Sequence, residues 1–221
     1  MNDRFVVNEY SQESHFATNK VLRNTYFLLS LTLVWSAIVA GVSMAMSMPS
    51  PNIIIMLVGL YGLLFLTEKN KNNSLGIVFT FVLTGFLGYT LGPILNMYVG
   101  AGLGWSIAPA LGGTALTFMA CSAYALTTKR DLSFLNGMLL AGFIVIVVGM
   151  IANIFLQMAM LSVAISGSFV LFATGVILLT TQSIIRGGET NYISATVSLY
   201  VSIYSLFLHL LQLLGLFSGD E

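Results

Sequence analysis

Charged side chains are scarce in this sequence. Asp, Glu, Lys and Arg make up 7% of its 221 residues, and hydrophobic residues make up 57%. A soluble domain carries about 25% charged residues. The net charge is zero and no basic cluster is interleaved with aromatic residues, so we do not expect nucleic acid as a partner. The composition predicts an all-α membrane protein with several transmembrane helices.

Cysteine and histidine are also nearly absent. Cys121 is the single cysteine, so no disulfide can form within the chain, and His15 and His209 are the two histidines. Their spacing supplies no zinc-type ligand cluster. The sequence contains no His-Glu-x-x-His, no Gly-x-Ser-Gly and no aspartate pair at membrane depth. We therefore expect no metal, no cofactor and no enzymatic activity.

Seven apolar runs are close to the length that crosses a hydrocarbon core of ~30 Å at ~1.5 Å per residue. They cover residues 24–48, 52–67, 75–96, 104–127, 133–157, 161–184 and 193–217, and none contains Asp, Glu, Lys or Arg. We expect a polar cytoplasmic tail at 1–23, a seven-helix membrane domain at 24–217 and a short outer C-terminus at 218–221. The first run is too long for a signal peptide and has no cleavage site.

The positive charges predict the orientation of these spans. They precede the first run or follow the second, fourth and sixth, and the alternate connections have none. By the positive-inside rule these segments are cytoplasmic, so an odd number of spans leaves the N-terminus inside and the C-terminus outside. The residues concerned are Arg4, Lys20, Arg23, Lys69, Lys71, Lys129, Arg130 and Arg186.

The last apolar run carries an unusual row of polar side chains. At 3.6 residues per turn their spacing of three or four places them on one stripe about 80° wide. The stripe consists of Ser194, Ser198, Ser202, Ser205, His209 and Gln212, and Thr196, Tyr200 and Tyr204 lie on a second face. We expect this helix inside the bundle, with its stripe along a polar path or bonded to its own i−4 carbonyls. His209 is either a neutral hydrogen-bonded residue or a pH gate.

Two glycine-containing segments complete the set of candidate sites. Gly88-x-x-x-Gly92 in the third run permits close helix packing, and Pro93 predicts a kink or a helix break that would expose carbonyls to a cavity. The short hairpin Arg186, Gly187, Gly188 and Glu189 stops the sixth helix and brings two polar helix faces together.

Several motifs resemble one known family. GPIL at 92–95, TALTF at 114–118, TTQSIIRGGETNYISATVSLY at 180–200 and KVLRNTYFLLSL at 20–31 resemble the Bax inhibitor family. The similarity is to its proteobacterial branch, described as modulators of FtsH, a membrane-anchored AAA protease. The resemblance implies six helices around a central seventh, a location in the bacterial inner membrane and FtsH as the partner.

The resemblance also implies a pair of special positions. Family members studied as channels leak calcium through a path closed by two aspartates, and those positions are Thr180 and Ser202 in this sequence. Two close carboxylates share a proton and attract a divalent cation, and hydroxyls do not. Our first hypothesis is therefore a substrate and negative regulator of FtsH. The alternative is a calcium or proton leak channel or transporter with a neutral polar path.

Overall fold

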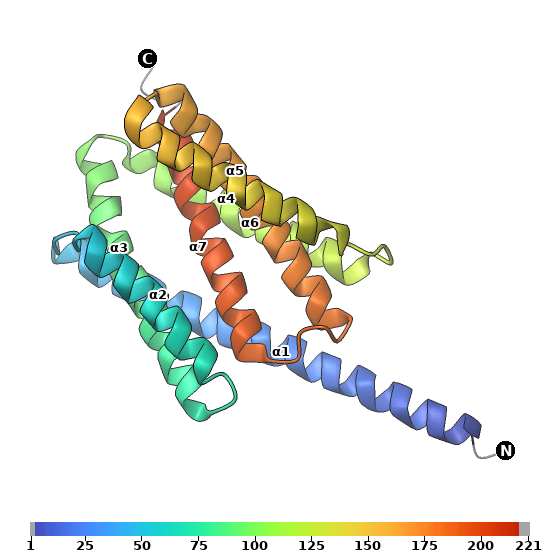
Figure 1. Ribbon diagram of the computed structural model, residues 1–221. Coiled ribbons are helices and arrows are strands. Elements are labelled where there is room, and N and C mark those ends of the chain that lie inside the picture. Colours follow the sequence, from blue (N-terminus) through green and yellow to red (C-terminus); the bar gives the residue numbers. More distant parts are fainter. Residues whose placement is uncertain (1–2, 217–221) are drawn as a thin grey trace.

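The computed structural model describes the backbone of residues 3–216 and the side chains from residue 19 onward. Within these residues the chain forms seven α-helices, one short 3-10 helix and no strand, so the all-α prediction is confirmed (Figure 1). The elements are α1 (Asp3–Ala45), α2 (Ile53–Lys69), α3 (Ser74–Gly100), η1 (Gly104–Ser106), α4 (Ile107–Thr127), α5 (Phe134–Leu156), α6 (Ala159–Ile185) and α7 (Tyr192–Leu216).

Each predicted apolar run overlaps one helix, and the largest difference lies at the N-terminus. The run predicted from residue 24 belongs to a helix that begins at Asp3. Figure 1 shows the first part of α1 extending away from the other helices. At the other end, the predicted C-terminal segment 218–221 lies outside the described residues.

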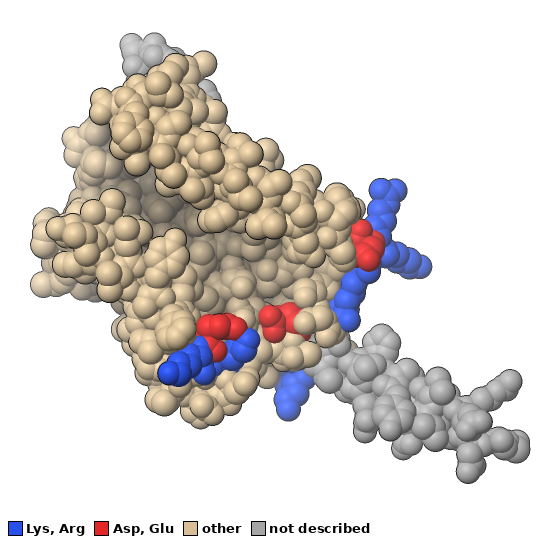
Figure 2. All heavy atoms as spheres, in the orientation of Figure 1, with Lys and Arg blue, Asp and Glu red and all other residues tan. Residues whose placement is uncertain are grey.

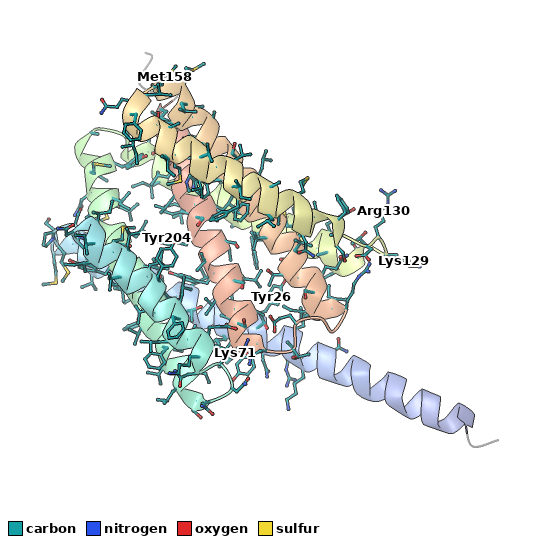
Figure 3. All side chains as sticks on the ribbon, viewed as in Figure 1. Tyr26, Lys71, Lys129, Arg130, Met158 and Tyr204 are labelled. Atoms are coloured by element: carbon teal, nitrogen blue, oxygen red, sulfur yellow. The ribbon has the colours of Figure 1, made fainter. Side chains whose placement is uncertain are left out.

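Six helices in the described part of the chain are long and apolar enough to cross a membrane. The exception is α2, whose 17 residues span only ~25 Å, short of the ~30 Å hydrocarbon core. Charged side chains gather at one end of the bundle (Figure 2). Lys71, Lys129 and Arg130 lie at this charged end, and Met158 lies at the opposite end (Figure 3). The described charged residues visible in this view thus lie at one end, as the predicted sorting of charge requires.

Close packing of α1 on α3 depends on glycines. A Cβ atom at Gly88 would lie 2.5 Å from the backbone oxygen of Ser36, and one at Gly85 would lie 2.8 Å from Nε1 of Trp35. Trp35 also donates from Nε1 to the carbonyl of Phe81 at 3.0 Å. The neighbour expected beside the Gly88-x-x-x-Gly92 motif is thus α1, whose backbone lies directly against α3.

The helix break expected at Gly92 and Pro93 does not occur, because α3 continues through Pro93 to Gly100. Pro93 has no N–H to donate to the carbonyl of Tyr89. The hydroxyl of Ser43, on α1, donates to that carbonyl instead, at 2.9 Å. Ser43 is 1% exposed, and a Cβ atom at Gly92 would collide with its side chain. A neighbouring helix therefore supplies the hydrogen bond that proline removes.

Helix α7 packs against α1, α2, α3, α4 and α6, whereas α5 packs on the outer side of α6. Its residues Leu199, Tyr200 and Leu206 are at most 1% exposed and belong to the main core cluster. The hydroxyl of Tyr200 bonds to Ser36 Oγ at 2.5 Å and donates to the carbonyl of Thr84 at 3.2 Å. The second polar face of α7 is thus an internal joint with α1 and α3.

Candidate functional site: the groove between α6 and α7

The predicted polar stripe of α7 lies along a groove that it forms with α6. The groove contains three hollows that follow one another from the charged end. The interfacial hollow, about 360 Å³, is lined by Ser133, Asn136, Leu179, Thr180, Gln182, Ser183, Arg186, Gly188, Glu189 and Ser198. The middle hollow, about 310 Å³, is lined by Leu64, Phe169, Phe172, Ala173, Val176, Val197, Ser198, Val201, Ser202 and Ser205. The far hollow, about 280 Å³, is lined by Met150, Asn153, Ile154, Ser162, Ile165, Ser166, Phe169, His209 and Gln212.

The three hollows adjoin one another, because neighbours share lining residues. Ser198 lines both the interfacial and the middle hollow, and Phe169 lines both the middle and the far hollow. The lining residues of α6 recur every three or four positions, so they form one face of the helix. The space-filling view is hollowed between α2 and the α5–α6 pair, where α7 lies (Figure 2).

The interfacial hollow is fixed by hydrogen bonds to the α4–α5 connection. Gln182, 4% exposed, donates from Nε2 to the carbonyl of Arg130 and accepts the N–H of Leu132 at Oε1, both at 2.8 Å. Arg186 donates from Nη2 to the same carbonyl at 2.7 Å and pairs through Nη1 with Asp131 at 3.3 Å. The end of α6 is thereby joined to the start of α5.

The start of α7 is joined to the α2–α3 connection in the same way. Asn191 caps α7 by accepting the N–H groups of Ile193 and Ser194, at 3.0 and 3.2 Å, and donates to the carbonyl of Lys71 at 3.0 Å. Ser194 donates to Glu68 Oε2 at 3.0 Å. The predicted Arg186–Glu189 hairpin thus lies between two anchored connections at the charged end.

Two acidic side chains of this layer are held in their charged form. Lys71 donates to Glu68, and this hydrogen bond lowers the pKa of Glu68, with a further contribution from Ser194. The hydroxyl and the N–H of Ser133 donate to Asp131 at 2.6 and 2.9 Å and lower the pKa of Asp131, with Arg186 adding to the effect. Both carboxylates are therefore charged near neutral pH.

The serines of the stripe have different environments. Ser194 contacts Glu68, and Ser198 is exposed at the junction of two hollows. Ser202 is 6% exposed and donates to its own helix at the Ser198 carbonyl, at 2.8 Å. Ser205 lines the middle hollow. At Ser202 the back-bonded alternative therefore holds, and the hydroxyl is already satisfied within α7.

His209 and Gln212 lie at the far end of the groove. Nδ1 of His209 is 2.7 Å from the carbonyl of Ser205, so Nδ1 is the donor and Nε2 of the neutral ring is an acceptor. The ring stacks on Phe169 at a centroid distance of 4.2 Å. His209 and Gln212 also line a largely apolar hollow of about 570 Å³ beside Tyr98. His209 therefore makes the packed, hydrogen-bonded contacts of a bundle residue.

The structure brings the predicted residues to one groove without gathering them at one point. Thr180 and Ser202 line adjacent hollows, not the same hollow. Sequence reasoning missed Gln182 as an anchor and Phe169 as the partner of His209. The signal that could have identified Gln182 is the presence of a glutamine at the end of an apolar run. Among the described residues, no group of three His, Cys, Asp or Glu side chains could hold a metal ion.

The helices and the groove define a multi-pass membrane protein of the all-helical class. The sequence from residue 18 to 219 matches the family described as "Inhibitor of apoptosis-promoting Bax1". The chain therefore belongs to the Bax inhibitor family, as its motifs indicated.

Curated relatives match the chain over nearly its full length. The "Modulator of FtsH protease YccA" of Escherichia coli K12 is 59% identical over 99% of this chain and all of the relative. The "Inner membrane protein YccA" of E. coli O6:H1 matches to the same extent. An uncharacterized protein of Pseudomonas aeruginosa is 55% identical over 91% of both chains. These similarities and the apolar helices support a multi-pass location in the inner membrane.

Proposed function

We propose that this protein is an inner-membrane substrate and negative regulator of the membrane protease FtsH. The observation that carries the proposal is the full-length identity of 59% to a relative named as a modulator of that protease. The names of the family and of this relative are those of an inhibitor and a modulator. We therefore assign a binding function and no catalytic one.

The shape of the chain supports such a role. The first apolar run begins at residue 24, whereas α1 begins at Asp3 and its first part extends away from the other helices, so this part of α1 would lie outside the bilayer (Figure 1). We propose that this N-terminal segment, residues 1–23, is cytoplasmic and is the part that the ATP-driven protease grips. Chain ends that project from a fold are the usual starting points for proteolysis.

The membrane domain would resist extraction once the protease holds the N-terminal segment. We propose seven spans, with α2 as a short span, α7 as the central helix, the N-terminus cytoplasmic and the C-terminus periplasmic. The contacts of α7 with five other helices and the charged end of the bundle support this arrangement. Pulling α1 breaks its joint with α3 and α7, so slow unfolding keeps the protease occupied and spares other substrates.

A leak pathway is the second candidate, and the groove is the feature that favours it. Hydroxyls of Thr180, Ser202 and Ser205 follow one another along the groove. However, the middle hollow is lined mainly by apolar side chains, and Ser202 donates to its own helix. An ion crossing there would lose hydration without charged or carbonyl ligands to replace it. We therefore rank regulation of the protease first.

The half-life of a second membrane substrate of FtsH tests the proposed function. Overproducing the full chain should lengthen that half-life, because the two substrates compete for one protease. Removing residues 2–15 should abolish the effect while the shortened chain still inserts in the membrane. A matched control alters Leu171, an exposed side chain of α6, to Ala and should behave as the full chain does. An unchanged half-life on overproduction of the full chain would reject the proposal.

A further inference from the structure

The interfacial and middle hollows together have the form of a site for one lipid molecule. We propose that they bind a phospholipid with a zwitterionic, ammonium-bearing head, phosphatidylethanolamine, in the leaflet at the charged end. The head would occupy the interfacial hollow and one acyl chain the middle hollow. No membrane-lipid site follows from the regulation of a protease, so this inference stands apart from the proposed function.

The polar half of the site carries one charge of each sign. Arg186 and Glu189 both line the interfacial hollow. The guanidinium bonds to Asp131 and to backbone carbonyls through Nη1 and Nη2, which leaves further N–H donors for a phosphate. One carboxylate oxygen of Glu189 accepts the N–H of Asn191 at 2.8 Å, and the other has no hydrogen bond in the described structure. The phosphate of the lipid head would pair with Arg186, and its ammonium group would pair with Glu189.

The hollow lies at the charged end of the bundle, where we expect the head-group region of the membrane. Its lining comes from the last turns of α6, the hairpin that follows and the first turns of α5, all at the charged end of the bundle. The anchored connection beside it keeps the opening in place, because Gln182 holds the α4–α5 backbone at two points. The polar lining is therefore preformed and faces the membrane surface.

The apolar half of the site adjoins the polar half at Ser198, which lines both hollows. The exposed Ser198 marks the junction, and beyond it Phe172, Val176 and Val201 line the middle hollow. Nearly all of these lining side chains are apolar, so the middle hollow suits a hydrocarbon occupant. An acyl chain placed there would bury methylene groups against apolar side chains, which is favourable.

Lipid titration of the purified full-length chain, followed by native mass spectrometry, tests the proposal. Phosphatidylethanolamine should bind about tenfold more tightly than phosphatidylglycerol, which lacks the ammonium group. Glu189→Gln keeps an acceptor for Asn191 and should abolish that preference. The control Glu68→Gln removes a carboxylate from the same end, outside the hollow, and should leave the preference intact.

The apolar half needs its own variant. Val176→Trp should fill the middle hollow and weaken phosphatidylethanolamine binding about tenfold, whereas Leu171→Trp, at a 74% exposed position on the same helix, should leave it unchanged. Glycerophosphoethanolamine, a head without chains, should bind at least tenfold more weakly than the lipid. The proposal would be overturned if the full chain bound the two lipids equally, or if it bound glycerophosphoethanolamine as tightly as phosphatidylethanolamine. A polypeptide retained in place of lipid would also overturn it. Unchanged binding in Val176→Trp would do the same.

Discussion

The contact between Ser43 and α3 gives a sharp test of how this fold tolerates a proline in a membrane helix. Ser43→Ala removes the donor to the Tyr89 carbonyl, to which Pro93 has no N–H to donate. The bond is 2.9 Å long and Ser43 is 1% exposed, so no water replaces the lost hydroxyl. A lost hydrogen bond that leaves a buried group unsatisfied costs about 1–3 kcal/mol, although bonds between membrane helices average about 0.6 kcal/mol. We expect a loss of about 1–1.5 kcal/mol.

A double-mutant cycle separates this effect from lost packing. In Pro93→Ala, the alanine at position 93 donates its N–H to Tyr89 within α3, so adding Ser43→Ala should cost only about 0.5 kcal/mol. The expected coupling is therefore about 0.5–1 kcal/mol. Equilibrium unfolding of the four proteins in mixed micelles measures it. Ser30→Ala, on an exposed intrahelical bond to Tyr26, is the control and should cost under about 0.5 kcal/mol. Equal costs of Ser43→Ala with and without Pro93 would refute the reasoning.

Three further predictions concern the same bundle. Gln182→Leu should lower the free energy of unfolding by about 1–3 kcal/mol, because the buried N–H of Leu132 loses its partner while the Arg130 carbonyl keeps its bond from Arg186; equilibrium unfolding that moves by under about 0.5 kcal/mol would contradict this. Gly88→Ala should lower the melting temperature by forcing α1 from α3, whereas Gly112→Ala, where a Cβ meets nothing within 4 Å, should not. Hydrogen bonds lower the pKa of Asp131, so its stabilisation is present above its unfolded pKa of about 3.9 and is lost as pH falls through the folded pKa. The difference in melting temperature between the natural chain and Asp131→Asn should accordingly vanish below the folded pKa of Asp131. A constant difference from pH 6 to pH 3 would contradict the stabilising role of these hydrogen bonds.

The positions of the helices could be predicted from the sequence, because the length and apolar character of a segment are local properties. Long apolar runs without charge mark helices in a membrane protein, and each of the seven runs overlaps one of the seven helices of residues 3–216. The start of α1 was misjudged, because polarity ends a membrane span and does not end a helix. The polar stripe of α7 was also readable, since helical spacing alone places its members on one face.

Partners across the bundle could not be read in the same way. Pro93 indicated a break, and only the position of Ser43 on another helix explains why α3 continues. Likewise, the stripe predicted a polar path, but its serines could bond either to their own helix or to a cavity, and the sequence does not choose. Ser202 bonds to a carbonyl of its own helix, whereas Ser198 is exposed where two hollows meet. Such choices depend on the distances between helices, which are set by packing.

The most direct measurement for the whole account is co-purification with FtsH. A proteolytically inactive FtsH should retain the full-length chain from solubilised inner membranes, and it should retain much less of a chain that lacks residues 2–15. The variant Gly112→Ala, altered on an open face of α4, should be retained like the full chain. Absence of the full chain from the FtsH fraction, or equal retention of the shortened chain, would contradict the account.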